Sequence, residues 1–293
     1  MSSLAGYEPL FELALLNMVL AFSQYIPLRA GVFSLGSAAF AAVGAYAAAI
    51  LATRYGVPPV VCVVIAVVAG GIFGALAAVP LARLRGVFQA LATLALVQIV
   101  LSTALNWTAL TDGALGINSI PKAVHLTEAA IAVVFVGYVL HVIGLSAIGR
   151  GFDIIREDET VAVSLGYSVR KHHMIAFVLS GAIAGLGGAM HAFSSYSITP
   201  NEFGFHMVVM LLAMVVLGGR VSVFGPVVGA IILTGLPELL RGFQDYRSVV
   251  QGALLMASIT FLPSGVVDTT RGWLRRRALT RGQAGADAAE VTS

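Results

Sequence analysis

The residues best suited to recognition chemistry in this chain gather in one stretch, GRGFDIIREDETVAVSLGYSVRKHH, numbers 149–173, which carries eight charges in twenty-five residues. Its apolar residues approximate the 3.6-residue spacing of one helix face: Phe152, Ile155, Ala162 and Leu165. The pattern predicts a short amphipathic helix over residues 151–166, ended by Gly166. Such a helix either lies solvated at a membrane surface or docks into the groove of a partner protein.

Covalent and metal chemistry have no comparable support in the sequence. The six histidines and the single cysteine form no HExxH motif and no similarly spaced ligand set. There is no Gly-x-Ser-x-Gly nucleophile elbow and no G-x-x-x-x-G-K-[ST] phosphate loop. We therefore expect no catalytic residue, no metal site and no cofactor or nucleotide bound by this chain.

A second group of residues is suited to contact with a small solute. Ser34, Gly36 and Ser37 interrupt an apolar run, and Phe40 follows them. One interpretation is a broken helix whose free amides line a route and bind a carboxylate, and the other is a tightly packed Ala/Gly helix. Thr93 and Gln98 are further polar candidates for the route, although such side chains also hydrogen-bond between helices.

The elements that must position these residues are membrane spans. Hydrophobic residues make up 58% of the chain and charged residues 11%, whereas a soluble domain is about 25% charged. We expect an all-α polytopic membrane protein of about nine spans, with eight to ten as the range. The apolar runs are 9–27, 31–53, 59–82, 86–106, 127–146, 173–193, 204–219, 222–240 and 248–265.

The weakest span predictions are runs 204–219 and 31–53, either of which could be re-entrant or broken. Residues 1–270 are expected to form one transmembrane domain, with its first run a span and not a cleaved signal peptide. Residues 271–293, a segment that is basic at its start, are expected to form a disordered cytoplasmic tail. Alternating the loops places most of the 17 Lys and Arg residues on one side, so we expect the N-terminus outside and the C-terminus in the cytoplasm.

Proton-coupled or potential-driven transport requires ionisable groups inside the bundle. Of the acidic residues, only Glu12, Glu128 and Glu238 lie within predicted runs, each near an end of its run. This deficit favours a channel, or a permease driven by a partner that hydrolyses nucleotide.

Four stretches, in order along the chain, resemble one family. They are GVFSLGSAAFAAVGAYAAA from Gly31, RLRGVFQALATLALVQIV from Arg83, REDETVAVSLGYSVRKHHMIAFVLSGAIAGLGGAM from Arg156, and MVVLGGRVSVFGPVVGAIILTGLPELLR from Met214. Together they resemble the permease subunits of branched-chain amino acid ABC importers of the Liv type, and are more LivM-like than LivH-like.

The resemblance implies an ATPase coupling helix with the pattern E-x-x-A-x-x-x-G. Glu159, Ala162 and Gly166 match that pattern, and Arg156 and Glu157 lie just upstream. The sequence departs from it at Val161 and Val163, where relatives commonly have small or polar residues.

The resemblance also implies partners and a location. These are two ABC ATPase subunits that bind the ATP, a second related permease and an extracytoplasmic substrate-binding protein, with membrane lipid around the chain, in a bacterial inner membrane. Loop 106–127 and segment 194–205, which contains Glu202, are the candidate surfaces for the binding protein. No nucleic acid is expected as a partner.

Branched-chain or other hydrophobic amino acids are the expected cargo. Two alternatives stay open at this point. The same type of importer could carry urea, short amides or a sugar, and a passive channel for a small neutral solute would also need few charges.

Overall fold

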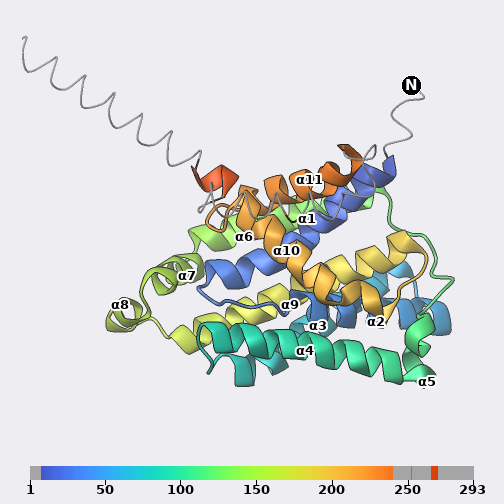
Figure 1. Ribbon diagram of the computed structural model, residues 1–293, viewed down its shortest axis with the longest axis horizontal. Coiled ribbons are helices and arrows are strands. Elements are labelled where there is room, and N and C mark those ends of the chain that lie inside the picture. Colours follow the sequence, from blue (N-terminus) through green and yellow to red (C-terminus); the bar gives the residue numbers. More distant parts are fainter. Residues whose placement is uncertain (1–7, 240–251, 253–264, 270–293) are drawn as a thin grey trace, which may run out of the picture.

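The computed structural model describes residues 8–239, 252 and 265–269 of the chain (Figure 1). Within these ranges the protein is built of helices, and its one β-type contact is an isolated bridge between Ile117 and Ile198. The long helices are α1 (Glu8–Arg29), α2 (Ser37–Tyr55), α3 (Pro59–Leu81), α4 (Val87–Asn106), α6 (Leu126–Leu145), α9 (Val169–Ser195), α10 (Phe205–Gly218) and α11 (Phe224–Leu239). The short ones are α5 (Thr108–Thr111), η2 (Gly113–Leu115), α7 (Ala147–Glu157), α8 (Glu159–Ser164) and η3 (Pro200–Phe203).

Seven of the described helical segments are long and apolar enough to cross a membrane, the last of them being η3 and α10 taken together. The apolar helix α11 is shorter. Eight of the nine predicted runs therefore coincide with helices. Residues 253–264, which hold most of the ninth run, and the predicted tail after residue 270 lie outside the described residues, so the count of nine stays a prediction.

Helix α9 lies at the centre of the bundle and packs against α1, α2 and α3. Its contacts with α3 are made by glycines, because a Cβ atom on Gly70 or Gly74 would overlap the backbone of Gly181 or Phe177. Gly44 on α2 meets the backbone of Gly185 in the same way. In a membrane, where lipid is as apolar as leucine, close backbone approach of this kind is a main source of helix association.

The second predicted span is interrupted at its start. Residues 31–36 are not helical, and α2 begins only at Ser37 after a cap at Gly36. Gly31 has a φ of 78°, a left-handed conformation that glycine adopts without strain. Of the two predicted spans in doubt, run 31–53 is thus a loop followed by a helix.

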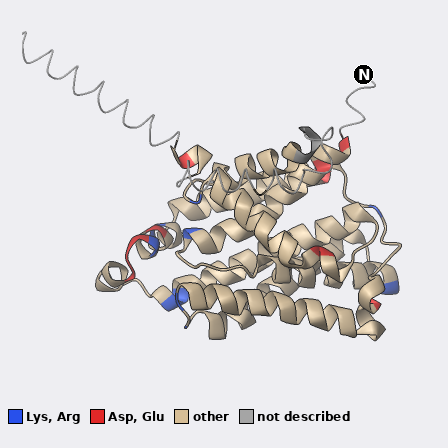
Figure 2. Cartoon of the chain, viewed as in Figure 1, with Lys and Arg blue, Asp and Glu red and all other residues tan. Residues whose placement is uncertain are grey.

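Charged residues gather at the two ends of the helices, which are otherwise nearly free of them (Figure 2). The end that carries α7 and α8, called the α8 end below, holds most of the described Lys and Arg residues. These are Arg29, Arg83, Arg85, Arg150, Arg156, Arg170, Lys171 and Arg220. The opposite end, called the α5 end, holds Arg54 and Lys122.

Candidate functional site

The segment predicted as one helix over residues 151–166 consists of two helices. Helix α7 starts earlier, at Ala147, and ends at Glu157, and α8 runs from Glu159 to Ser164. Asp158 separates them because its backbone is extended, with φ −157° and ψ 113°, and its carboxylate Oδ1 accepts hydrogen bonds from the amides of Thr160 and Val161. An aspartate in this position caps a new helix and so ends the preceding one. The prediction of a single continuous helix is therefore wrong.

Helix α8 ends at Ser164, and the predicted terminator Gly166 lies just beyond its C-cap residue Leu165. The Gly166 amide donates to the Val163 carbonyl and the Tyr167 amide to the Ala162 carbonyl, the two bonds of a Schellman motif. Gly166 has a φ of 84°, which suits glycine at this position.

The apolar side chains of α8 point both inward and outward. Ala162 is fully buried, whereas Val161, Val163 and Leu165 are 50%, 61% and 62% exposed. We call these three residues the α8 triad. Leu165, predicted on the same face as the buried Phe152 and Ile155, is on the exposed surface instead, because the break at Asp158 changes the direction of the chain. Helix α8 lies at the end of the molecule where charge is concentrated (Figures 1 and 2). The exposed α8 triad forms an apolar surface there.

A partly buried ion pair joins α7 to α1. The Arg29 guanidinium donates from Nε to Asp153 Oδ1 at 3.0 Å and from Nη2 to Oδ2 at 2.9 Å. Two parallel bonds of this kind fix the orientation of both partners as well as their distance. Helix α7 is thereby attached to the first helix of the bundle.

The charged residues at or near the predicted coupling pattern differ in their exposure and in their partners. Arg156 is mostly buried and lies 3.7 Å from carboxylate oxygens of both Asp153 and Glu157, whereas Glu157 itself is exposed. Glu159 of α8 reaches across to Arg85 in the α3–α4 loop, with 3.3 Å between Nη2 and Oε2. The α7–α8 segment is therefore joined to two distant places in the sequence, α1 and the α3–α4 loop.

A histidine ring joins α7 to α9. The His172 ring lies edge-on to Phe152 and Tyr167, with centroids 6.0 and 5.7 Å apart, and its Nδ1 is 2.9 Å from the Ser168 carbonyl oxygen. Gly151 leaves the space for this ring, because a Cβ there would overlap His172 Nε2. Together with the short α8–α9 connection, this packing makes α7, α8 and the start of α9 one assembly.

The predicted route residues at the start of α2 form a buried polar group. Thr93 Oγ1 accepts from the Leu35 amide at 2.9 Å, Ser34 Oγ accepts from the Gly36 amide at 3.2 Å, and Gln24 Nε2 donates to the Ser34 carbonyl. Ser37 Oγ lies 3.4 Å from Ser180 Oγ of α9. Side chains thus satisfy the backbone of a loop that lies inside an apolar bundle, which is required wherever non-helical chain is buried there.

Ser34, Gly36, Ser37, Phe40 and Thr93 are brought together, and all five are buried. They do not line an open route in this conformation. Gln98 is not part of the group. It is exposed on α4, as are Ser102 and Asn106, one and two turns further on. Thr93 and Gln98 therefore lie on opposite faces of α4.

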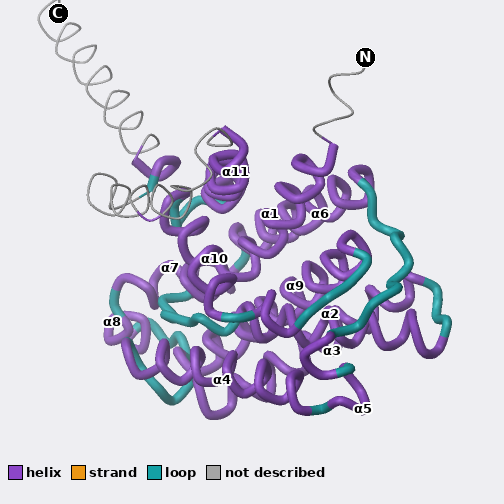
Figure 3. Tube along the Cα trace, turned by 45° about the vertical axis from the view of Figure 1, so that its right-hand side comes forward, coloured by secondary structure: helices purple, strands orange, loops and turns teal. Residues whose placement is uncertain are grey.

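The two predicted docking segments for a binding protein meet at the α5 end. Ile117 and Ile198 exchange backbone hydrogen bonds of 3.0 Å in both directions, and the Ile120 amide donates to the Tyr196 carbonyl. Glu202 Oε2 lies 3.1 Å from His191 Nε2. Figure 3 shows the long loop before α6 running along this end of the helices. Among the described residues, no group of three or more His, Cys, Asp or Glu side chains is placed to hold a metal ion.

The sequence of this chain has clear relatives. A family model described as branched-chain amino acid transport system / permease component matches residues 10–259. The chain belongs to this family. The permease is 32% identical to the LivM protein of the high-affinity branched-chain amino acid transport system of Escherichia coli K12, over 89% of this chain and 68% of that protein.

Two other relatives agree with this assignment. The LivM protein of Salmonella typhimurium is 31% identical, over 90% of the permease and 68% of the relative. A probable LivH protein of Methanocaldococcus jannaschii is 25% identical, over 92% of both chains. No solved structure matches the permease significantly. The assignment of a LivM-like permease therefore rests on sequence relatives, and the permease is a multi-pass membrane protein.

Several residues of the permease were missed by sequence reasoning. Asp158 could have been found, because an aspartate just before an apolar-periodic segment is a typical helix N-cap. Arg29, Arg85 and Asp153 carry no such signal, because their partners are far away in the sequence.

Proposed function

We propose that this chain is a transmembrane permease subunit of an ATP-driven ABC importer for branched-chain or other hydrophobic amino acids, in a bacterial inner membrane. ATP would be bound and hydrolysed by two partner ATPase subunits. The observation that carries the proposal is the α8 triad, an exposed apolar surface on an assembly braced to α1, α9 and the α3–α4 loop.

These contacts matter because α7 and α8 can transmit motion to the bundle only if they move as a rigid unit. A displacement of α8 would be transmitted to α1 through Asp153 and Arg29. It would be transmitted to α9 through Phe152 and His172. Helix α9 is in turn locked to α2 and α3 by glycine contacts. Binding of nucleotide to the partner would then bias a two-state rearrangement of the whole bundle.

We further propose that the α8 end faces the cytoplasm, with the N-terminus outside. The gathering of Lys and Arg at that end supports this orientation, because cytoplasmic loops carry an excess of both. The α5 end would then receive the extracytoplasmic binding protein on the joined segments 106–127 and 194–205.

The second permease subunit would lie against α4. Exposed Gln98, Ser102 and Asn106 form a polar stripe at i, i+4 and i+8 on this membrane-spanning helix. Polar side chains within a membrane-spanning helix normally face other helices or a water-filled cavity and not lipid. A route between the two permeases would place Gln98 at its wall and leave the buried group around Ser37 to open with the rearrangement.

The test is uptake by the assembled importer in proteoliposomes with ATP supplied on the α8 side. Radiolabelled leucine should accumulate only when the ATPase, the second permease and the binding protein are present. Val163→Asp should release the ATPase and abolish uptake. Leu115→Asp, at another exposed apolar position but at the α5 end, should retain the ATPase.

Other outcomes separate the alternatives. Accumulation against a gradient by this chain alone would refute an ATP-driven mechanism. Downhill flux by this chain alone, unaffected by Val163→Asp, would identify a passive channel. Accumulation of urea, a short amide or a sugar in place of leucine would keep the importer and change its cargo.

A further inference from the structure

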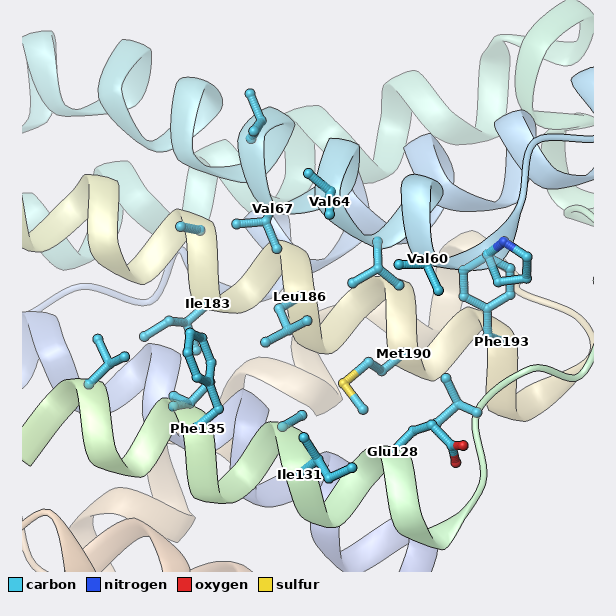
Figure 4. A pocket seen from close by; sticks show the side chains of 18 of the residues that line it. Val60, Val64, Val67, Glu128, Ile131, Phe135, Ile183, Leu186, Met190 and Phe193 are labelled. Carbon is cyan, nitrogen blue, oxygen red and sulfur yellow. The ribbon is translucent and has the colours of Figure 1, made fainter.

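A long apolar groove runs along one side of the bundle. Its walls are α3 and α6, its floor is α9, and its volume is about 710 Å³ (Figure 4). Val60 and Val64 line one wall, Ile131 and Phe135 the other, and Leu186 and Met190 the floor. The groove exists because α6 packs chiefly on α1 and stands away from α3.

The lining residues leave nothing for a polar ligand to bind. Glu128 is the one charged residue that lines the groove, at the rim near the start of α6. Its Oε2 already accepts hydrogen bonds from the His125 amide and the Thr127 hydroxyl. An occupant of the groove must therefore be apolar along its length.

The lining is also unsuited to another transmembrane helix. Helix–helix contacts in membranes favour small residues that let backbones approach. The α3–α9 contact follows this rule through Gly70, Gly74, Gly181 and Gly185. The groove instead presents mostly valine, leucine, isoleucine, phenylalanine and methionine side chains.

The length of the groove suits an extended acyl chain. The lining residues span Pro59 to Val68 on α3 and Leu179 to Phe193 on α9, which at 1.5 Å per residue is about 15–20 Å. The length is about half to two-thirds of the roughly 30 Å hydrocarbon core, close to the depth of one leaflet.

From these observations we propose that the groove between α3 and α6 is a binding site for the acyl chains of one phospholipid, held in the leaflet at the α5 end. The lipid fills the space that α6 leaves beside α9 and so supports α6 against the rest of the bundle. Val60 and Ile131, 76% and 69% exposed, lie at opposite edges of the opening and contact the chains. This inference does not depend on the cargo or on the ATPase.

The test measures phospholipid that stays bound to the purified protein. The permease, in its native assembly, is extracted from a membrane of phosphatidylethanolamine and phosphatidylglycerol into a mild detergent, washed extensively and analysed by mass spectrometry. Wild type should retain phospholipid. Val64→Trp, which fills the groove, should weaken retention roughly tenfold, the factor for about two fewer buried methylene groups.

Leu76→Trp is the matched control, because Leu76 is 64% exposed on the same helix and does not line the groove. It should retain phospholipid as wild type does. Equal retention by Val64→Trp and wild type, with both eluting as folded protein, would overturn the proposal. A photo-crosslinker at position 64 that reacts with a second permease subunit and not with lipid would also overturn it.

Discussion

Gly31 and Arg156 are in backbone contact. A Cβ atom on Gly31 would lie 3.0 Å from Arg156 Cα and 3.4 Å from its amide nitrogen. Gly31 opens the partly buried loop that holds Ser34 and Gly36, and Arg156 lies in the last turn of α7. The proposed coupling assembly therefore touches the proposed route directly, with no flexible side chain in between.

This contact predicts that Gly31→Ala impairs leucine uptake by the assembled importer. The methyl group must push α7 and the loop apart, and alanine at positive φ adds about 1–2 kcal/mol of strain. Gly56→Ala is the control, because Gly56 has a φ of 61° and nothing within 4 Å of the added atom. Uptake of labelled leucine by the reconstituted importer should fall strongly for the first variant only. Equal losses would show that backbone strain alone is responsible.

The Arg29–Asp153 pair should contribute to stability as a unit. Asp153→Asn leaves the partly buried Arg29 guanidinium without its carboxylate, whereas Arg29→Gln leaves Asp153 near Arg156, so the aspartate variant should cost more. Because Asp153 is partly exposed and screened, we expect a coupling energy of about 1 kcal/mol. Thermal denaturation in detergent of both single variants and the double variant measures it. Strictly additive shifts would contradict the interpretation.

The Asp158 cap should hold α8 at every physiological pH. Hydrogen bonds from the Val161 and Thr160 amides lower the pKa of this carboxyl below its ordinary value of about 3.9. The stabilisation is thus fully present above that value and is lost only as the pH falls through the lowered pKa. Hydrogen exchange at Thr160 and Val161 should be fast in Asp158→Ala, whereas Asp158→Asn, which can still cap, should stay protected. A change in protection of the wild type between about pH 5 and 8, beyond the intrinsic rate, would count against the cap.

The glycines between α3 and α9 should not tolerate a methyl group. Gly70→Ala places a Cβ against the Gly181 carbonyl, and such overpacking costs about 1–3 kcal/mol. Gly137→Ala on α6 meets only the Phe22 ring at 3.8 Å and should gain up to about 1 kcal/mol of helix propensity. Melting midpoints in detergent should therefore move in opposite directions. A stabilising effect at both positions would show that α3 and α9 are not in close contact.

The polar stripe on α4 predicts a role for Gln98 that folding does not need. Gln98→Leu should leave the free energy of unfolding within about 0.5 kcal/mol of wild type, as surface changes usually do, and should reduce leucine uptake. Leu91→Met, at a nearby exposed apolar position on α4, should change neither. Unchanged uptake in Gln98→Leu would remove this residue from the route.

Local sequence patterns predicted most of the fold. Long apolar runs allowed eight helices to be placed from the sequence, because the need to satisfy backbone groups in lipid leaves few other structures. A tightly packed Ala/Gly helix was one interpretation of run 31–53, and Gly166 predicted the end of α8. Each of these signals lies within a few residues of the feature that it determines.

The sequence by itself determined that this is a helical membrane permease of the branched-chain amino acid transport family, with a charged segment at one end. Only the tertiary structure decided that the α8 triad is exposed, that Glu159 pairs with Arg85, that Gly31 abuts Arg156 and that Gln98 faces outward. Periodicity reports which face of a helix is apolar, but it does not report what that face meets. Pairs far apart in the sequence depend on how the helices pack, which no local pattern encodes.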